Sequence, residues 1–258
     1  MNYDNILIHV ENGIGTITIN RPDVRNALNM STVNEMRMVL QAWKTDPDVQ
    51  VVVFTGAGDK AFAAGADISQ IRERTLTDGL DAQMQSFYRE VELYEKPTIA
   101  AINGFALGGG CELAISCDIR IASSNAKLGL PELNLAIIPG AGGTQRLARL
   151  VGKGKAVEMI LIGNFVKAEE AKSIGLISQV TTPEALLAAV YETAAAILDK
   201  GPLAVRLAKI AIQTGFETDM HTGLVIERLA QTILFSSEDK LEGTTAFLEK
   251  RKPVYKGK

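Results

Sequence analysis

The chain contains few of the residues on which disulfide frameworks and zinc sites depend. Its 258 residues include only two cysteines and two histidines. Two cysteines cannot form the disulfide framework of a small secreted protein, and so few thiols and imidazoles argue against a structural zinc site. We therefore expect Cys111 and Cys117 to be small buried thiols in a reducing compartment, and we expect no metal site.

Long apolar runs and an excess of one charge are also absent. No charge-free apolar run reaches about 18 residues, so no membrane span is expected. The 27 basic and 30 acidic residues give a net charge of −3, which argues against general binding to nucleic acids or membrane surfaces. The N-terminal segment shows no signal or transit pattern, and a cytoplasmic location is the prediction.

The composition is typical of a globular protein, with 47% hydrophobic and 22% charged residues. Strand and helix patterns alternate in the first part of the chain, and helix patterns dominate from residue 183 to about residue 250. This order predicts an α/β fold with a helical C-terminal part. The expected strands are a hairpin (6–10 and 14–19), buried strands at 49–55, 98–102 and 119–122, and a short strand at 177–180.

Helix patterns fill the segments between these strands. The first covers 29–44, with Ser31 as its cap and Val33, Met36, Leu40 and Trp43 on one buried face. A second runs from 68 to 94 with a break near 77–79. Shorter helices are expected at 111–116, 144–151, 156–162 and 168–173. Residues 61–66 and 104–110, which are rich in small residues, are expected to be loops.

Common catalytic signatures are missing. The sequence has no phosphate-binding GxxxxGK[ST] loop, no GxSxG nucleophile elbow and no HExxH zinc motif. The segment that starts at Gly140 fails the GxGxxG dinucleotide pattern because position 145 is Gln. Serine nucleophiles, catalytic zinc and nucleotide phosphates therefore lack their usual sequence signals.

Two loops of small residues, 63–67 and 108–112, are candidates for a binding site. Small residues allow a ligand to approach the backbone closely, and the second loop leads into a helix whose N-terminal amides favour an anion. Each loop could therefore supply one N–H group to a single oxygen atom. The loops alone, however, favour an interpretation as tight turns and close helix packing.

Two glutamates stand out because they are flanked by apolar residues. Glu112 lies in the first turn of a predicted helix, and Glu132 follows Pro131. Two nearby carboxylates separate their titrations, so that one stays protonated near neutral pH, and such a pair can donate and accept protons in one step. The carboxylates alone favour a simpler interpretation, in which Glu112 complements the helix dipole and Glu132 lies on the surface.

The sequence resembles the enoyl-CoA hydratase (crotonase) family over nearly its whole length. The residues that carry the resemblance are 20–28 (NRPDVRNAL), 54–68 (FTGAGDKAFAAGADI), 103–113 (NGFALGGGCEL), 129–132 running on to 138–146, and 247–251 (FLEKR). The resemblance implies a crotonase-like spiral of ββα units over residues 1–195. It also implies a helical region, 196–258, that assembles the chain into a homotrimer or a hexamer.

The resemblance further implies an acyl-CoA substrate and no separate cofactor. The thioester oxygen would lie between the N–H groups of Ala66 and Gly109. Glu132 would donate a proton to C2, and Glu112 would activate water. The implied contacts with the substrate or its coenzyme A are Arg25, Ala64, Asp67, Ile68 and Gly140, with Phe247 and Lys250 reaching the coenzyme on a neighbouring subunit.

Three activities remain open within this resemblance. Glutamate at both catalytic positions is the pattern of hydratases, which add water to a 2-enoyl-CoA and give a 3-hydroxyacyl-CoA. The alternative is a Δ3-Δ2 enoyl-CoA isomerase or another acyl-CoA enzyme of this type. A remoter alternative is an RNA-binding relative, which the net charge of −3 and the mixed charges of residues 71–74 disfavour.

Overall fold

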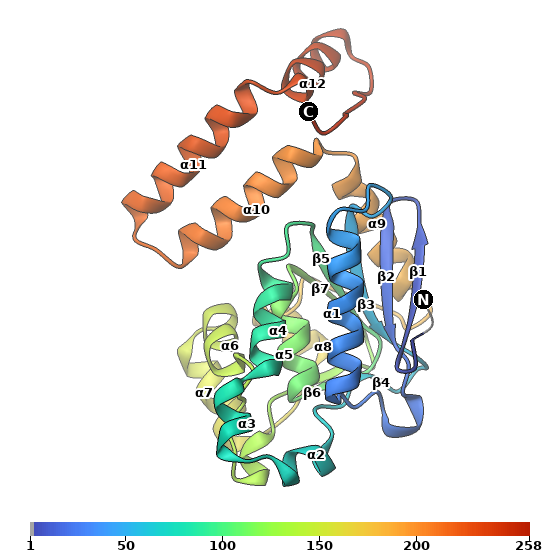
Figure 1. Cartoon of the computed structure of the whole chain (residues 1–258), viewed down its shortest axis with the longest axis vertical. Coiled ribbons are helices and arrows are strands. Elements are labelled where there is room, and N and C mark those ends of the chain that lie inside the picture. The colour runs from blue at the N-terminus through green and yellow to red at the C-terminus, as the bar shows by residue number, and fades with distance from the viewer. Residues whose placement is uncertain (1–2) are drawn as a thin grey trace.

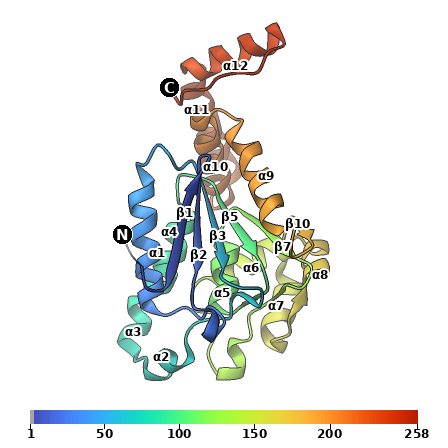
Figure 2. The same cartoon turned by 90° about the vertical axis from the view of Figure 1, so that its right-hand side faces the viewer.

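A computed structural model describes residues 3–258, so the first two residues of the predicted spiral lie outside it. Within this range, six strands form the larger sheet (Figures 1 and 2). Their order across the sheet is β1 (Ile6–Glu11), β2 (Ile14–Ile19), β3 (Val51–Gly56), β5 (Thr98–Ile102), β7 (Ile119–Ser123) and β10 (Gln179–Thr181). The first two strands pair antiparallel, and every later pair is parallel. The predicted hairpin and the strands predicted at 49–55, 98–102 and 119–122 are confirmed to within two residues, and the short strand expected at 177–180 is β10, which lies at 179–181.

A second, smaller sheet was missed by the sequence prediction. It consists of β4 (Ala61–Ala63), β6 (Phe105–Leu107), β8 (Lys127–Gly129) and β9 (Val166–Lys167). The segments expected to be loops at 61–66 and 104–110 each contain one of these strands. Each long strand β3, β5 and β7 is followed by a short strand in the smaller sheet, so the chain repeats one unit three times and winds between the two sheets.

Helices cover both faces of the larger sheet (Figure 2). On one face lie α1 (Met30–Lys44), α4 (Gln83–Glu92) and the wholly buried α5 (Gly109–Ser116). On the other face, α9 (Leu186–Leu198) packs Leu186, Val190 and Ala194 against the strands. The apolar face predicted for the first helix is buried, but its cap is Asn29, which accepts a hydrogen bond from Thr32 N at 2.8 Å, and not Ser31.

The long helix predicted over 68–94 is three helices. They are α2 (Ile68–Glu73), α3 (Leu76–Asp81) and α4. The chain is extended at Arg74 and left-handed at Ala82, where φ is +43°. Thr75 and Asp78 form a capping box that starts α3, so the break expected near residues 77–79 lies a few residues to either side.

The segment between β8 and α9 contains short helical elements besides β9 and β10. They are the 3₁₀ turn η2 (Glu132–Leu135), α6 (Gly143–Val151), α7 (Lys153–Ile162) and α8 (Ala168–Ser173). A further 3₁₀ turn, η1 (Pro22–Val24), precedes α1. The cysteines Cys111 and Cys117 are buried free thiols, as predicted.

Three C-terminal helices extend away from the two sheets (Figures 1 and 2). They are α10 (Pro202–Phe216), α11 (Met220–Phe235) and α12 (Glu238–Glu249). An ion pair anchors α10 to the sheets, because Lys209 Nζ lies 2.7 Å from Asp118 Oδ2. The boundary predicted at residue 195 falls inside α9, which packs on the sheet. No helix within residues 3–258 is long and apolar enough to cross a membrane.

Candidate active site

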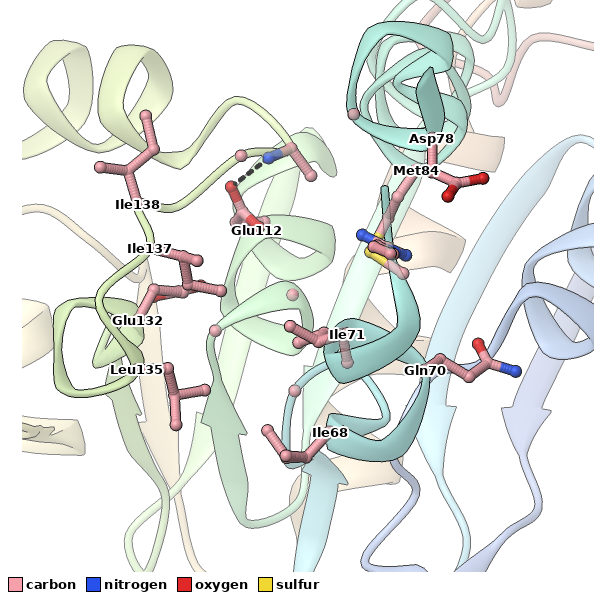
Figure 3. Close-up of a pocket in the computed structure, with 18 of the residues that line it drawn as sticks. Ile68, Gln70, Ile71, Asp78, Met84, Glu112, Glu132, Leu135, Ile137 and Ile138 are labelled. Atoms are coloured by element: carbon pink, nitrogen blue, oxygen red, sulfur yellow. Dashed lines mark hydrogen bonds between the residues drawn. The ribbon is translucent and has the colours of Figure 1, made fainter. Parts of the chain in front are cut away.

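A cavity of about 990 Å³ lies where the two small-residue loops meet (Figure 3). Ile68, Ile71 and Met84 form one wall, and Leu135, Ile137 and Ile138 form the wall opposite. The cavity brings together seven of the residues predicted for the site, namely Ala64, Ala66, Ile68, Gly109, Glu112, Glu132 and Gly140. Residues from segments far apart in the sequence therefore share one largely apolar pocket.

The backbone amides of Ala66 and Gly109 are neighbours at this cavity. Leu28 N donates to Gly65 O at 2.8 Å, and Asp67 N donates to Leu28 O at 2.9 Å, which turns the amide of Ala66 away from residue 28. A Cβ atom placed on Gly109 would lie 3.5 Å from Ala66 N. Neither amide has an acceptor among residues 3–258, so both donors are available to a bound oxygen atom.

Glycines allow the two loops to approach this closely. Gly108 precedes α5 with a φ of +50°, a conformation that side chains disfavour. A Cβ atom at Gly110 would lie only 2.0 Å from Ala63 O. The hydroxyl of Tyr88 donates to Gly109 O at 2.7 Å and fixes the start of the helix from the other side.

Glu112 projects from the first turn of α5 into the cavity and is 3% exposed. Its Oε1 accepts hydrogen bonds from Ala141 N and Gly143 N, both at 2.8 Å. Burial raises the pKa of Glu112, although these two amides and the charge of Arg146 oppose the rise. The amide pair therefore stabilises the ionised form of an otherwise buried carboxylate.

Glu132 is the first residue of η2 and lies on the same side of the cavity as Glu112 (Figure 3). A Cβ atom at Gly108 would lie 3.0 Å from its Oε1, so the carboxyl group is next to the loop that carries Gly109. Its Oε2 is buried without a hydrogen-bond partner in the described chain. Burial and the nearby charge of Glu112 raise the pKa of Glu132 to about 7. Glu132 is therefore partly protonated near neutral pH.

Four of the predicted contacts do not line the cavity. Arg25 is exposed, and its carbonyl accepts a hydrogen bond from Ala64 N at 3.1 Å. The side chain of Asp67 caps α2 by accepting a hydrogen bond from Ser69 N, and its Oδ2 lies 3.6 Å from Nη2 of Arg21. Phe247 and Lys250 lie at the end of α12, away from the cavity (Figure 1). Their predicted contact with a neighbouring subunit's coenzyme stays a prediction.

Sequence reasoning missed the residues that hold the catalytic candidates in place. Tyr88 carries no sequence signal, because its role depends on a contact between α4 and α5. Arg146 lies within the stretch 129–146 that carries the family resemblance, but no role was expected for it. Among residues 3–258, no three His, Cys, Asp or Glu side chains gather in a way that could hold a metal ion.

Comparison with known proteins identifies the class to which this site belongs. Residues 9–258 match the family model described as enoyl-CoA hydratase/isomerase. The chain belongs to this family. It is 48% identical to the short-chain-enoyl-CoA hydratase of Clostridium acetobutylicum, over 98% of this chain and 97% of that protein. It is also 48% identical to the crotonyl-CoA hydratase of Syntrophomonas wolfei, over 98% of each chain.

Solved structures agree with this assignment. The crystal structure of an enoyl-CoA hydratase from Bacillus anthracis superposes with a TM-score of 0.95 at 43% identity, and the match covers 99% of this chain and 100% of that one. The predicted crotonase-like α/β fold is therefore confirmed.

Proposed function

We propose that this protein is an enoyl-CoA hydratase, which reversibly adds water to a 2-enoyl-CoA to give a 3-hydroxyacyl-CoA. The observation that carries the proposal is a single cavity with two free amide donors, Ala66 and Gly109, and two carboxylates, Glu112 and Glu132. The 48% identity to two proteins named as hydratases of short 2-enoyl-CoA thioesters supports it.

The amides would act on the thioester group. Water is a poor nucleophile towards an alkene, so the conjugated thioester must first be polarised. Hydrogen bonds from Ala66 N and Gly109 N to the thioester oxygen stabilise the enolate that develops when water adds. The loss of one such donor typically raises a barrier by about 3–4 kcal/mol. The second donor lies at a helix N-terminus, which also favours negative charge.

The carboxylates would move the protons. The two amides that hold Glu112 favour its ionised form, so Glu112 takes a proton from the attacking water. The pKa of Glu132, about 7, keeps a proton available on this group near neutral pH, and Glu132 donates that proton to C2. Water addition needs no redox or group-transfer partner, so no cofactor other than the coenzyme A of the substrate is proposed.

The acyl chain would lie between the two apolar walls of the cavity. Ile68, Ile71 and Met84 face Leu135, Ile137 and Ile138 across it, and such walls suit a hydrocarbon chain. From the names of the two similar proteins, we propose a short 2-enoyl-CoA such as crotonyl-CoA as the substrate.

The C-terminal helices would assemble the protein into a homotrimer or a pair of trimers. None of the residues of α10 and α11 is fully buried in the single chain. Large apolar side chains on these helices are exposed to solvent, namely Ile210, Ile212, Phe216, Leu224, Leu229, Ile233 and Phe235. So many exposed apolar side chains on two neighbouring helices are typical of a subunit interface. The two free thiols support the cytoplasm as the location.

Product analysis tests the proposal against its main alternative. The purified protein is incubated separately with crotonyl-CoA and with its 3-enoyl isomer, and the products are separated by chromatography. A hydratase gives 3-hydroxybutyryl-CoA from crotonyl-CoA. An isomerase gives crotonyl-CoA from the 3-enoyl thioester and adds no water to either. RNA filter binding at two salt concentrations tests the remoter alternative, for which the hydratase proposal predicts no retention.

A further inference from the structure

The loop that holds Glu112 is itself held by Arg146. Ala141 N donates to Oε1 of Glu112 at 2.8 Å, and Nη1 of Arg146 donates to Ala141 O at 2.9 Å. Both backbone polar groups of Ala141 are therefore fixed, one by the carboxylate and the other by the guanidinium group. Arg146 does not line the cavity, so it would act on the reaction without touching the substrate.

The loop is shaped to receive the guanidinium group. Gly142 lies between the two amides that bind Glu112 and has a φ of +103°. A Cβ atom at this position would lie 2.1 Å from Nη1 of Arg146. Any side chain here would displace Arg146 and so loosen the carbonyl that it holds.

Glu92 of α4 orients Arg146 in turn. Nε and Nη2 of Arg146 bind the two oxygens of Glu92 at 3.0 and 2.8 Å, which is a bidentate ion pair. Burial alone raises the pKa of Glu92, but hydrogen bonds from Arg146 and Arg89 outweigh this effect, and the pKa lies below its ordinary value. Glu92 therefore stays ionised throughout the range in which the protein would act.

The same ionic chain continues to the C-terminal helices. Arg89 Nη1 lies 2.7 Å from Glu92 Oε2, and Arg89 also binds both oxygens of Glu217 at 2.6 and 2.8 Å. Glu217 is the C-cap residue of α10, at the turn into α11, so its bonds with Arg89 join this turn to α4. Four alternating charges thus connect the α10–α11 turn to the loop that holds Glu112.

We propose that Arg146 is a positioning residue for Glu112 and that the Glu92–Arg89–Glu217 chain links its placement to the C-terminal helices. The inference rests on the proposed hydratase function, in which Glu112 is the base. A loop held in this way keeps the carboxylate at one orientation towards the attacking water, and such positioning affects turnover more than substrate binding.

The charges around Glu112 give the inference a second readout. The titratable groups that interact electrostatically with Glu112 are Glu132 from η2, Tyr88 from α4, Cys111 on its own helix and Arg146 from α6. Arg146 is the cation of this set, and its charge lowers the pKa of Glu112. Its removal should move the acid limb of the pH–rate profile to higher pH.

The test compares Arg146→Gln, Arg146→Lys and Glu217→Gln with a matched control. The control is Arg37→Gln, because Arg37 binds Glu90 on the same helix α4 at 2.9 Å without reaching the loop. We expect Arg146→Gln to lose at least about tenfold in kcat with KM changed less than about twofold. Lysine keeps the charge but not the forked geometry, so Arg146→Lys should recover part of the loss. Glu217→Gln should show a smaller loss, and Arg37→Gln none.

Amide hydrogen exchange of residues 140–143 provides a readout that does not depend on activity. We expect faster exchange in Arg146→Gln, in Arg146→Lys to a smaller extent, and in Glu217→Gln, but not in Arg37→Gln. Wild-type exchange and an unmoved acid limb in Arg146→Gln would overturn the positioning role. Wild-type behaviour of Glu217→Gln alone would overturn the link to the C-terminal helices. If the wild-type protein hydrates no enoyl-CoA, the proposed function fails, while the exchange rates still decide whether Arg146 holds the loop.

Discussion

The carboxyl groups of Glu112 and Glu132 line one cavity but meet opposite environments. Oε1 of Glu112 accepts two backbone N–H groups at 2.8 Å. Oε2 of Glu132 is buried and has no hydrogen-bond partner within the described range. Burial raises the pKa of both groups, but only Glu112 has amide donors that favour its carboxylate form. We therefore expect the pair to hold one proton near neutral pH, and we expect Glu132 to carry it.

The rate of hydration should have a bell-shaped dependence on pH. Addition of water needs Glu112 ionised and Glu132 protonated, so kcat/KM should fall as the pH rises through about 7, where Glu132 loses its proton. It should also fall at low pH, when Glu112 becomes protonated. Dehydration of the 3-hydroxyacyl-CoA needs the same single proton on the pair and should follow the same bell. Initial rates in both directions across the pH range check this, and a rate that keeps rising above neutral pH would contradict it.

Glu132→Gln should stabilise the folded protein at alkaline pH. The pKa of Glu132 is about 7 in the folded state against an ordinary value of 4.5. Ionisation of Glu132 is therefore less favourable in the folded than in the unfolded protein. The free energy of unfolding falls as the pH rises from about 4.5 to about 7. The neutral amide avoids this loss.

The gain for a partly exposed group should be about 1–3 kcal/mol near pH 8 and should vanish near pH 4.5. Urea unfolding of both proteins at the two pH values measures it. Equal stabilities at both values would show that Glu132 does not titrate in this way.

Gly143→Ala should remove activity by displacing Glu112. The new Cβ atom would lie 2.9 Å from Oε1 of Glu112 and 3.0 Å from Cδ1 of Leu130. The carboxylate must move away and lose its hydrogen bond, so we expect kcat to fall by about tenfold or more. Gly154→Ala is the control, because a Cβ atom there meets nothing within 4 Å. Similar rates for the two variants would contradict the proposed cradle for Glu112.

The C-terminal helices should carry the subunit interface. Leu229 and Ile233 are one helical turn apart on α11 and are 57% and 52% exposed in the single chain. Light scattering should give the mass of three or six copies of the 27.7 kDa chain. Leu229→Asp should shift this mass towards the single chain, since a charge buried in an apolar interface is costly. A wild-type protein that stays monomeric at high concentration would rule out assembly through this face.

The larger sheet could be predicted from the sequence, but the smaller sheet could not. Strands such as Val51–Gly56 are continuous apolar runs, and this pattern identifies a buried parallel strand without knowledge of its partners. Strands such as Ala61–Ala63 have only three residues, all small or aromatic. They exist because segments about 40 residues apart pair with each other, and local patterns carry no information about such pairing.

The reactive groups of the site could be predicted from the sequence, but the residues that hold Glu112 in place could not. Carboxylates among apolar residues and loops of small residues are local signals that marked Glu112, Glu132 and the two loops as candidates. The family resemblance then singled out the amides of Ala66 and Gly109, and all four residues lie around one cavity. The support of Glu112 by Ala141, Gly143 and Arg146 depends on how the loop before α6 folds over α5. That relation joins residues about 30 positions apart and leaves no pattern in the sequence.

Hydration of crotonyl-CoA in isotopically labelled water is the measurement that tests the hydratase proposal most directly. The wild-type protein, Glu112→Gln and Glu132→Gln are each mixed with the thioester, and the product is examined by mass spectrometry. We expect rapid formation of 3-hydroxybutyryl-CoA that carries one labelled oxygen with the wild-type protein, and near-complete loss of that product with either variant. Equal rates in all three proteins, or no labelled product from crotonyl-CoA or longer 2-enoyl thioesters, would contradict a hydratase that uses both carboxylates.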